Sequence, residues 1–79
     1  MTNADSFGQW LKSQRRSMGV RQKDFARLVY CAPITLRKIE ADQLRPSFDL
    51  ARIIVGQFGL PPHEESELIR LARGHASGE

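Results

Sequence analysis

The fold is decided by residues 22–40, which read QKDFARLVYCAPITLRKIE. Two sets of apolar residues in this stretch recur at the spacing of one helical face. They are Phe25, Leu28 and Val29 in the first set, and Leu36 and Ile39 in the second. Because Pro33, between the sets, lacks a backbone N–H and has a preset φ, it suits the first turn of a new helix. The stretch therefore predicts helices over residues 22–29 and 33–40, joined by a tight corner at residues 30–32.

The second of these helices keeps a cationic face turned outward. If Leu36 and Ile39 pack inward, the remaining side chains of the helix point to solvent. These outward residues are Ile34, Thr35, Arg37 and Lys38. Arginine and lysine can donate to the O6 and N7 atoms of guanine, and the methyl groups of isoleucine and threonine can pack on the methyl group of thymine. This face has the chemistry of a surface that enters the major groove of DNA.

Length and composition limit what the rest of the chain can do. A chain of 79 residues makes one domain, too short for a large buried active-site cleft but long enough for a small helical core. It contains no apolar run long enough to span a membrane, and residues 1–5 show no signal-peptide pattern, so we expect a cytoplasmic protein. The single cysteine, Cys31, agrees with a reducing compartment, and its apolar neighbours favour a small core residue over a reactive thiol.

The positive charge is concentrated in one part of the chain. Residues 1–52 carry ten of the twelve Lys and Arg residues and five of the nine acidic residues, which gives +5, whereas residues 53–79 carry −2. A solvated surface is the ordinary explanation of such an excess. Here the positive part contains the predicted helix pair, so the charge favours an anionic partner.

Start and stop signals predict three further helices. Ser6 and Ser47 are predicted N-caps, and Pro62 suits a first helical turn. The three helices are expected over residues 6–18, 47–58 and 62–73. No strand-like alternation and no internal repeat accompany them. The chain is therefore expected to be a compact, five-helix, all-α domain.

The expected core collects the apolar faces of the five helices. It consists of Phe7, Trp10, Leu11, Phe25, Leu28, Val29, Leu36, Ile39, Leu50, Ile53, Ile54, Phe58 and Leu68. Trp10 lies on the apolar stripe of a short helix, so we assign it to the core and not to base stacking. We expect residues 6–73 to form the domain, residues 1–5 a disordered tail, and residues 74–79 a flexible tail or linker.

Beyond these local patterns, the run from Phe7 to Gly74 resembles the helix-turn-helix domain of the phage Cro and repressor type (XRE type), a lambda-repressor-like fold. The resemblance rests on several segments that match together: residues 7–12, Gln22, residues 35–42 and residues 45–47. It extends to a bacterial subgroup in which this domain precedes an ATPase or tetratricopeptide region of a larger regulator. The resemblance implies a transcriptional regulator, or its N-terminal DNA-binding domain, whose partner is double-stranded DNA.

The resemblance also implies roles for individual residues. Gln22 matches a glutamine that contacts the DNA backbone and supports the reading helix. The positions from which that helix reaches bases and nearby phosphates are Pro33, Ile34, Arg37 and Lys38. Arg15 and Glu40 match a partly buried ion pair between the first helix and the end of the third. Arg45 falls in a loop that runs along the phosphates.

Basic residues at the start of the second helix add to this expectation on physical grounds. Arg21 and Lys23, together with Arg45, would attract phosphates regardless of sequence. The exposed N–H groups at the start of the second helix also favour a phosphate oxygen. We therefore expect DNA-backbone contacts at the start of the second helix and base contacts on the third.

Three departures from the family pattern bear on DNA reading. Tyr30 stands where the family usually has a glycine, and a bulky residue tolerates positive φ poorly, so a strained or differently shaped corner is expected. Ala32 stands at the usual Ser/Thr cap, which removes about 1 kcal/mol of capping. Pro33 and Ile34 have no side-chain donors. Base readout should therefore rest on the two basic residues of the same helix and on DNA shape.

The sequence also bears on classes of function other than DNA binding. His63 and His75 are the only histidines, and no Cys, His or carboxylate spacing suggests metal or nucleophile chemistry, so we predict no enzyme, metal or cofactor. The alternative that stays open is a protein-interaction module that keeps the fold without reading DNA sequence. We expect a monomeric or weakly dimeric free domain, with homodimer pairing on DNA or through a region C-terminal to residue 79.

Overall fold

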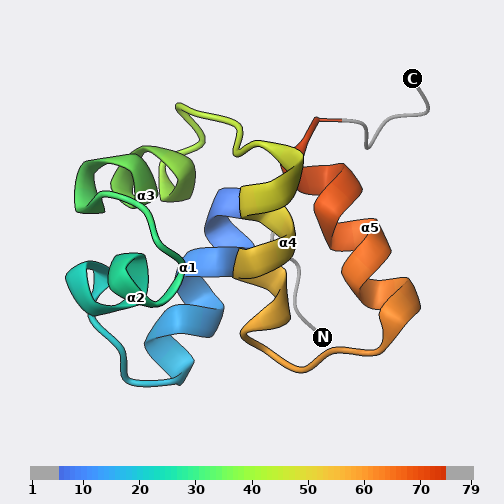
Figure 1. Cartoon of the computed structure of the whole chain (residues 1–79), viewed down its shortest axis with the longest axis horizontal. Helices are drawn as coiled ribbons and strands as arrows, with labels where there is room; N and C mark the ends of the chain where they lie inside the picture. Colours follow the sequence, from blue (N-terminus) through green and yellow to red (C-terminus); the bar gives the residue numbers. More distant parts are fainter. Residues whose placement is uncertain (1–5, 75–79) are drawn as a thin grey trace. The chain divides into compact units, whose positions relative to one another are not determined.

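The computed structural model describes residues 6–74, and these residues form five helices and no strand. The helices are α1 (Phe7–Ser17), α2 (Gln22–Leu28), α3 (Pro33–Glu40), α4 (Phe48–Gly56) and α5 (Pro62–Ala72), drawn in Figure 1. The predicted all-α class is confirmed, and the helix ends agree with the prediction to within two residues. The tail predicted at residues 1–5 lies outside the described residues, as does all of the predicted C-terminal tail except Gly74.

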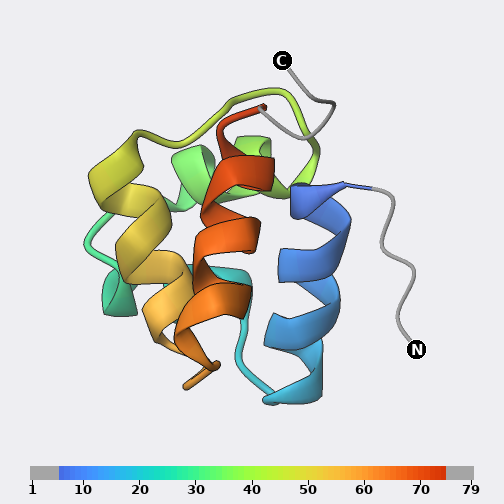
Figure 2. The same cartoon turned by 90° about the vertical axis from the view of Figure 1, so that its right-hand side faces the viewer.

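The chain divides into two units, Met1–Leu44 with α1 to α3 and Arg45–Glu79 with α4 and α5. In the first unit, α3 packs against both α1 and α2. In the second unit, α4 packs against α5, and the two helices lie side by side in both views (Figures 1 and 2). The prediction of one domain over residues 6–73 stays a prediction.

The helix ends carry the signals that the sequence predicted. The hydroxyl group of Ser6 accepts a hydrogen bond from the N–H of Gln9 at 3.1 Å, and that of Ser47 accepts one from the N–H of Leu50 at 3.1 Å. Gly19, just past α1, has a φ of 73°, the left-handed conformation that ends many helices. The two serine contacts satisfy N–H groups that have no partner within their own helix.

The core of the first unit contains most of the residues that the sequence assigned to it. The buried apolar side chains are Phe7, Trp10, Leu11, Phe25, Ala26, Val29, Leu36 and Ile39. The rings of Phe7 and Trp10 lie with their centroids 5.7 Å apart, and Trp10 is only 9% exposed. The assignment of Trp10 to the core is therefore confirmed. Ala26 is a core residue that the sequence reading missed.

The prediction that Leu28 belongs to the core is wrong, because the side chain is 46% exposed. An α-helix turns by about 100° per residue, and Phe25, Ala26 and Val29 together define the buried face of α2. On this geometry Leu28 points about 100° away from the centre of that face. The small side chain of Ala26 takes the inward position that the spacing had given to leucine.

The same error occurs in the second unit, where Ile53 is 36% exposed. The buried face of α4 is formed by Ala51, Ile54 and Val55. At about 100° per residue, Ile53 lies roughly 150° from the centre of this face and points toward solvent. The other predicted core residues of this unit, Leu50, Phe58 and Leu68, are half-buried, whereas Ala72 is buried.

The corner between α2 and α3 is closed by a left-handed tyrosine. Tyr30 has a φ of 63°. Its N–H donates to the carbonyl oxygen of Arg27 at 3.3 Å, and the N–H of Cys31 donates to that of Ala26 at 3.0 Å. This pair of bonds is the Schellman arrangement, in which glycine usually takes the left-handed position. A side chain there costs roughly 1–2 kcal/mol, so the strain expected at Tyr30 is present.

Cys31 and Ala32 connect the corner at Tyr30 to α3. Ala32 is the N-cap of α3 and its side chain makes no capping bond, as the sequence predicted. Cys31 is half-buried. Burial raises the pKa of the Cys31 thiol, while a hydrogen bond from the backbone N–H of Leu36 acts in the opposite direction. A thiol with a raised pKa stays protonated at neutral pH, which disfavours nucleophilic or redox chemistry at this site.

Candidate nucleic-acid interface

The outward face of α3 combines exposed apolar and basic side chains. Pro33, Ile34, Arg37 and Lys38 are exposed, and Thr35 is half-buried. On the opposite side of the same helix, Leu36 and Ile39 are at most 1% exposed. The side chains of Arg37 and Lys38 make no hydrogen bond or ion pair with any other described residue. A helix locked on one side therefore presents two unpaired cations on the other.

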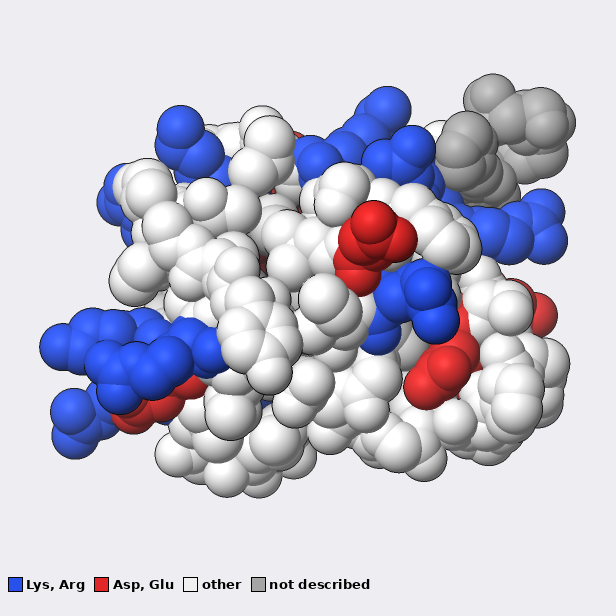
Figure 3. All heavy atoms as spheres, viewed as in Figure 1, with Lys and Arg blue, Asp and Glu red and all other residues white. Residues whose placement is uncertain are grey.

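Further basic residues lie at the start of α2. Arg21 is the N-cap of α2 and Lys23 lies in its first turn, and both are exposed. Arg27, four residues after Lys23 on the same helix, is also exposed and was not among the predicted site residues. Figure 3 shows Lys and Arg side chains over α2 and α3 and also over other parts of the same face. The positive charge predicted from the sequence is therefore displayed on the helix pair.

The structure places eight of the nine predicted DNA-binding residues in the first unit and one in the second. The exception is Arg45, an exposed residue at the start of the second unit. Its guanidinium group lies near Gly74 of the same unit, since a Cβ atom built on Gly74 would be 2.6 Å from the Arg45 Cζ atom. Arg45 therefore lies beside Gly74, two residues past the end of α5.

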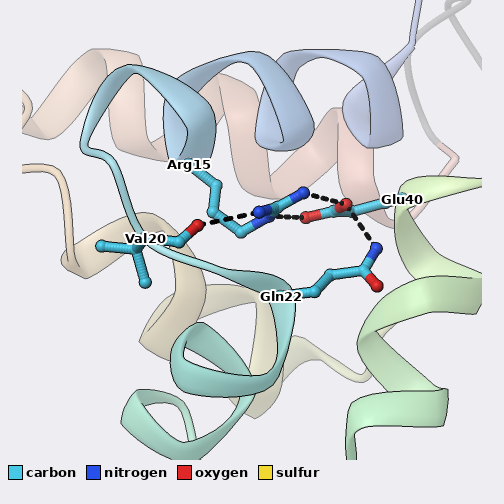
Figure 4. A network of polar contacts seen from close by, with 4 residues as sticks. All are labelled: Arg15, Val20, Gln22 and Glu40. Atoms are coloured by element: carbon cyan, nitrogen blue, oxygen red, sulfur yellow. Dashed lines mark hydrogen bonds and ion pairs between the residues drawn. The ribbon is translucent and has the colours of Figure 1, made fainter.

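A buried ion pair holds α3 to α1 (Figure 4). The Nε atom of Arg15 donates to Oε2 of Glu40 at 2.6 Å, and Nη2 donates to Oε1 at 3.0 Å. The two side chains are 10% and 2% exposed. Because both carboxylate oxygens receive a donor, the buried charges are compensated. The pair that the resemblance implied is present in the structure.

Two further hydrogen bonds extend this contact to the start of α2. Nη1 of Arg15 donates to the backbone oxygen of Val20 at 2.8 Å, and Nε2 of Gln22 donates to Oε1 of Glu40 at 2.8 Å. We call these four residues the Glu40 network; Figure 4 shows that it joins α1, the loop after it, α2 and α3. One amide proton of Gln22 is used in this way. Gln22 therefore supports α3 and retains one side-chain donor.

A second contact between α1 and α3 was not foreseen from the sequence. Asp42, with a φ of 61°, accepts from the N–H of Gly8 at 3.1 Å and from the hydroxyl of Ser6 at 2.6 Å. A Cβ atom on Gly8 would lie 2.6 Å from the backbone oxygens of Ile39 and Glu40. At this distance only glycine permits so close an approach. The end of α3 is thus bonded to α1 at two places: Asp42, just past α3, binds Gly8 near the start of α1, and Glu40 binds Arg15 near its end.

Within residues 6–74, no group of three or more His, Cys, Asp or Glu side chains could hold a metal ion. The second unit has an open groove of about 560 Å³ between α4 and α5, lined by Asp49, Arg52, Ile53, Gly56, Glu65 and Ile69. No helix among the described residues is both long and apolar enough to cross a membrane.

Comparison with known proteins adds one finding. Residues 11–64 match the family model described as helix-turn-helix. This range contains all of α2, α3 and α4. Searches of curated proteins and of solved structures return no significant match.

Proposed function

Because the chain belongs to the helix-turn-helix family of the phage Cro and repressor type, we propose that it binds double-stranded DNA and regulates transcription. It would act as a whole regulator or as the N-terminal DNA-binding domain of a larger one. In this proposal α2 and α3 form the motif, and α3 lies in the major groove. The observation that carries the proposal is the exposed, unpaired pair Arg37 and Lys38 on a helix whose inner face is buried.

The interface residues of the first unit divide into those that suit DNA phosphates and those that suit base edges. Arg21, Lys23 and the remaining amide proton of Gln22 suit phosphate oxygens at the edge of the groove. On α3, Arg37 and Lys38 suit guanine acceptors, and the methyl groups beside them suit thymine. We assign Arg45 to phosphates. Pairing of two copies on half-sites about one DNA turn apart would supply the affinity that a single short helix lacks.

Arg37→Ala or Lys38→Ala is expected to lower affinity for the preferred duplex by about 1–3 kcal/mol and to relax preference at one or two base positions. Pro33 and Ile34 offer no side-chain donors. Arg37 and Lys38 are therefore the candidates for discriminating one base from another. The preferred duplex is obtained by selection from a random pool, and each variant is titrated on that duplex and on random duplex. Arg70→Ala on α5 is the control and should bind as the original chain does. Equal losses on both duplexes would assign both residues to phosphates.

Lys23→Gln is expected to weaken binding to all duplexes alike and to lower the salt dependence by about one released ion. The measurement is the slope of log K against log salt with mixed-sequence duplex. Lys12→Gln is the matched control, because Lys12 is exposed on α1 and lies outside the proposed interface. If the original chain does not bind duplex at low salt, the result would instead favour a protein-interaction module.

A further inference from the structure

Tyr30 is the most exposed large apolar residue of the described chain, with 84% of its surface accessible. It also has a left-handed backbone, with a φ of 63°. Neither its ring nor its hydroxyl group contacts another described residue through a hydrogen bond or ring interaction. No side-chain hydrogen bond or ring contact with another described residue therefore offsets the strain of this conformation. Strained residues of this kind are concentrated at sites that bind a ligand.

The position of Tyr30 in the chain limits what it can meet. It lies three residues before Pro33, the first residue of α3. The N-terminal residues of a recognition helix contact base edges, so the chain just before them has to leave the groove. It leaves past the sugar–phosphate backbone that forms the edge of the groove. An exposed side chain at the corner is therefore placed to meet that backbone.

The chemistry of the corner fits such a contact. Tyrosine is among the side chains that donate to phosphate oxygens, and its ring can pack on a sugar. The nearby Leu28 and Ile34 are each 46% exposed and apolar. Glycine, the usual residue at this turn, would offer neither a ring nor a hydroxyl group.

We propose that Tyr30 is a DNA-backbone contact that holds the start of α3 at the edge of the major groove. Its hydroxyl group donates to a phosphate oxygen and its ring packs on the adjoining sugar. The inference rests on the proposed function, since it requires α3 to enter the groove. It makes Tyr30 a positioning residue that acts on every sequence alike.

The test uses Tyr30→Gly and Tyr30→Asn, two residues that adopt the left-handed conformation more readily than tyrosine. Both variants should melt no lower than the original chain, because neither residue adds strain to the left-handed backbone at position 30. Tyr30→Phe, which removes the hydroxyl group alone, should bind a mixed-sequence duplex about tenfold more weakly, the effect of losing a hydrogen bond to a charged group. Tyr30→Gly and Tyr30→Asn also lose the ring that packs on the sugar, so both should bind at least as weakly as Tyr30→Phe.

Salt dependence separates this contact from an ionic one. Tyrosine releases no counterion, so the slope of log K against log salt should stay unchanged in all three variants. Lys23→Gln, measured beside them, should lower that slope. Phe48→Ala is the control for an exposed aromatic ring, because Phe48 is 53% exposed and lies in the other unit. It should bind as the original chain does.

The outcomes distinguish the inference from the proposed function. If the original chain binds duplex and Tyr30→Gly binds equally well, the inference is overturned and the proposed function stands. If both variants melt lower and lose binding together, Tyr30 belongs to the fold and the inference is again overturned. If the original chain does not bind duplex at low salt, the proposed function fails and the inference falls with it.

Discussion

Glu40→Ala is expected to lower the free energy of unfolding by about 3–5 kcal/mol, since removing one partner leaves a buried charge without compensation. Arg15, which is 8% exposed, would keep only its bond to the backbone oxygen of Val20. Gln22 would lose its acceptor at the same time. One substitution would thus remove the polar contacts of Glu40 with both α1 and α2.

Urea unfolding of Glu40→Ala, Arg15→Met and the double variant Arg15→Met/Glu40→Met measures this effect. The double variant should lose less than either single variant, because replacing both members of a buried pair by apolar groups is often close to neutral. Glu67→Ala on α5 is the control: Glu67 is exposed, and its loss should change stability by no more than about 0.5 kcal/mol. Unchanged stability of Glu40→Ala would contradict a role for the Glu40 network in holding α3.

Gly8→Ala is expected to destabilise the first unit by about 2–3 kcal/mol, because the new methyl group overfills a closed space. Its Cβ atom would lie 2.6 Å from two backbone oxygens of α3 and from Oδ1 of Asp42. Backbone oxygens cannot turn aside as a flexible side chain can, so α1 and α3 would have to move apart. The helical preference of alanine returns only about 1 kcal/mol.

Gly56→Ala is the matched control for Gly8→Ala. Gly56 is also helical, but a Cβ atom there would meet nothing within 4 Å. This substitution should therefore stabilise the chain by about 0.5–1 kcal/mol. Both variants are compared by thermal melting with the original chain. Equal shifts of the same sign would show that the close approach at Gly8 has no energetic consequence.

The helix ends could be predicted because local interactions decide them. Ser6 and Ser47 cap the helices that follow them through a hydrogen bond three residues along the chain. Pro33 fixes the start of α3 without reference to any distant contact. The outward face of α3 followed from the inward spacing of Leu36 and Ile39, both of which are buried.

Contacts between residues far apart in the sequence could not be found from local patterns. Asp42 is 34 residues from Gly8, and Glu40 is 25 residues from Arg15. The ion pair was expected only because the chain resembles a family that has it. A glycine in the first turn of α1 indicates an unusual site but does not name its neighbour, so the role of Gly8 became visible only in the structure.

Apolar spacing gave the wrong inward residues where alanine competes with a larger side chain. Ala26 and Ala51 are fully buried, whereas Leu28 and Ile53 are partly exposed. Spacing weighted by side-chain size favours leucine and isoleucine, but burial follows the direction of each side chain around its helix, and the two alanines lie on the buried faces. The exposed Leu28 is one consequence, and it leaves an apolar residue beside the corner at Tyr30.

The central claim, that α3 enters the major groove of DNA, is tested most directly by nuclear magnetic resonance. The backbone amide signals of residues 6–74 are followed while a selected duplex is added at low salt. The account predicts that the largest changes occur at Ile34, Thr35, Arg37 and Lys38 and at the start of α2, with little change along α5. Largest changes in the groove between α4 and α5, with α3 unaffected, would contradict the account.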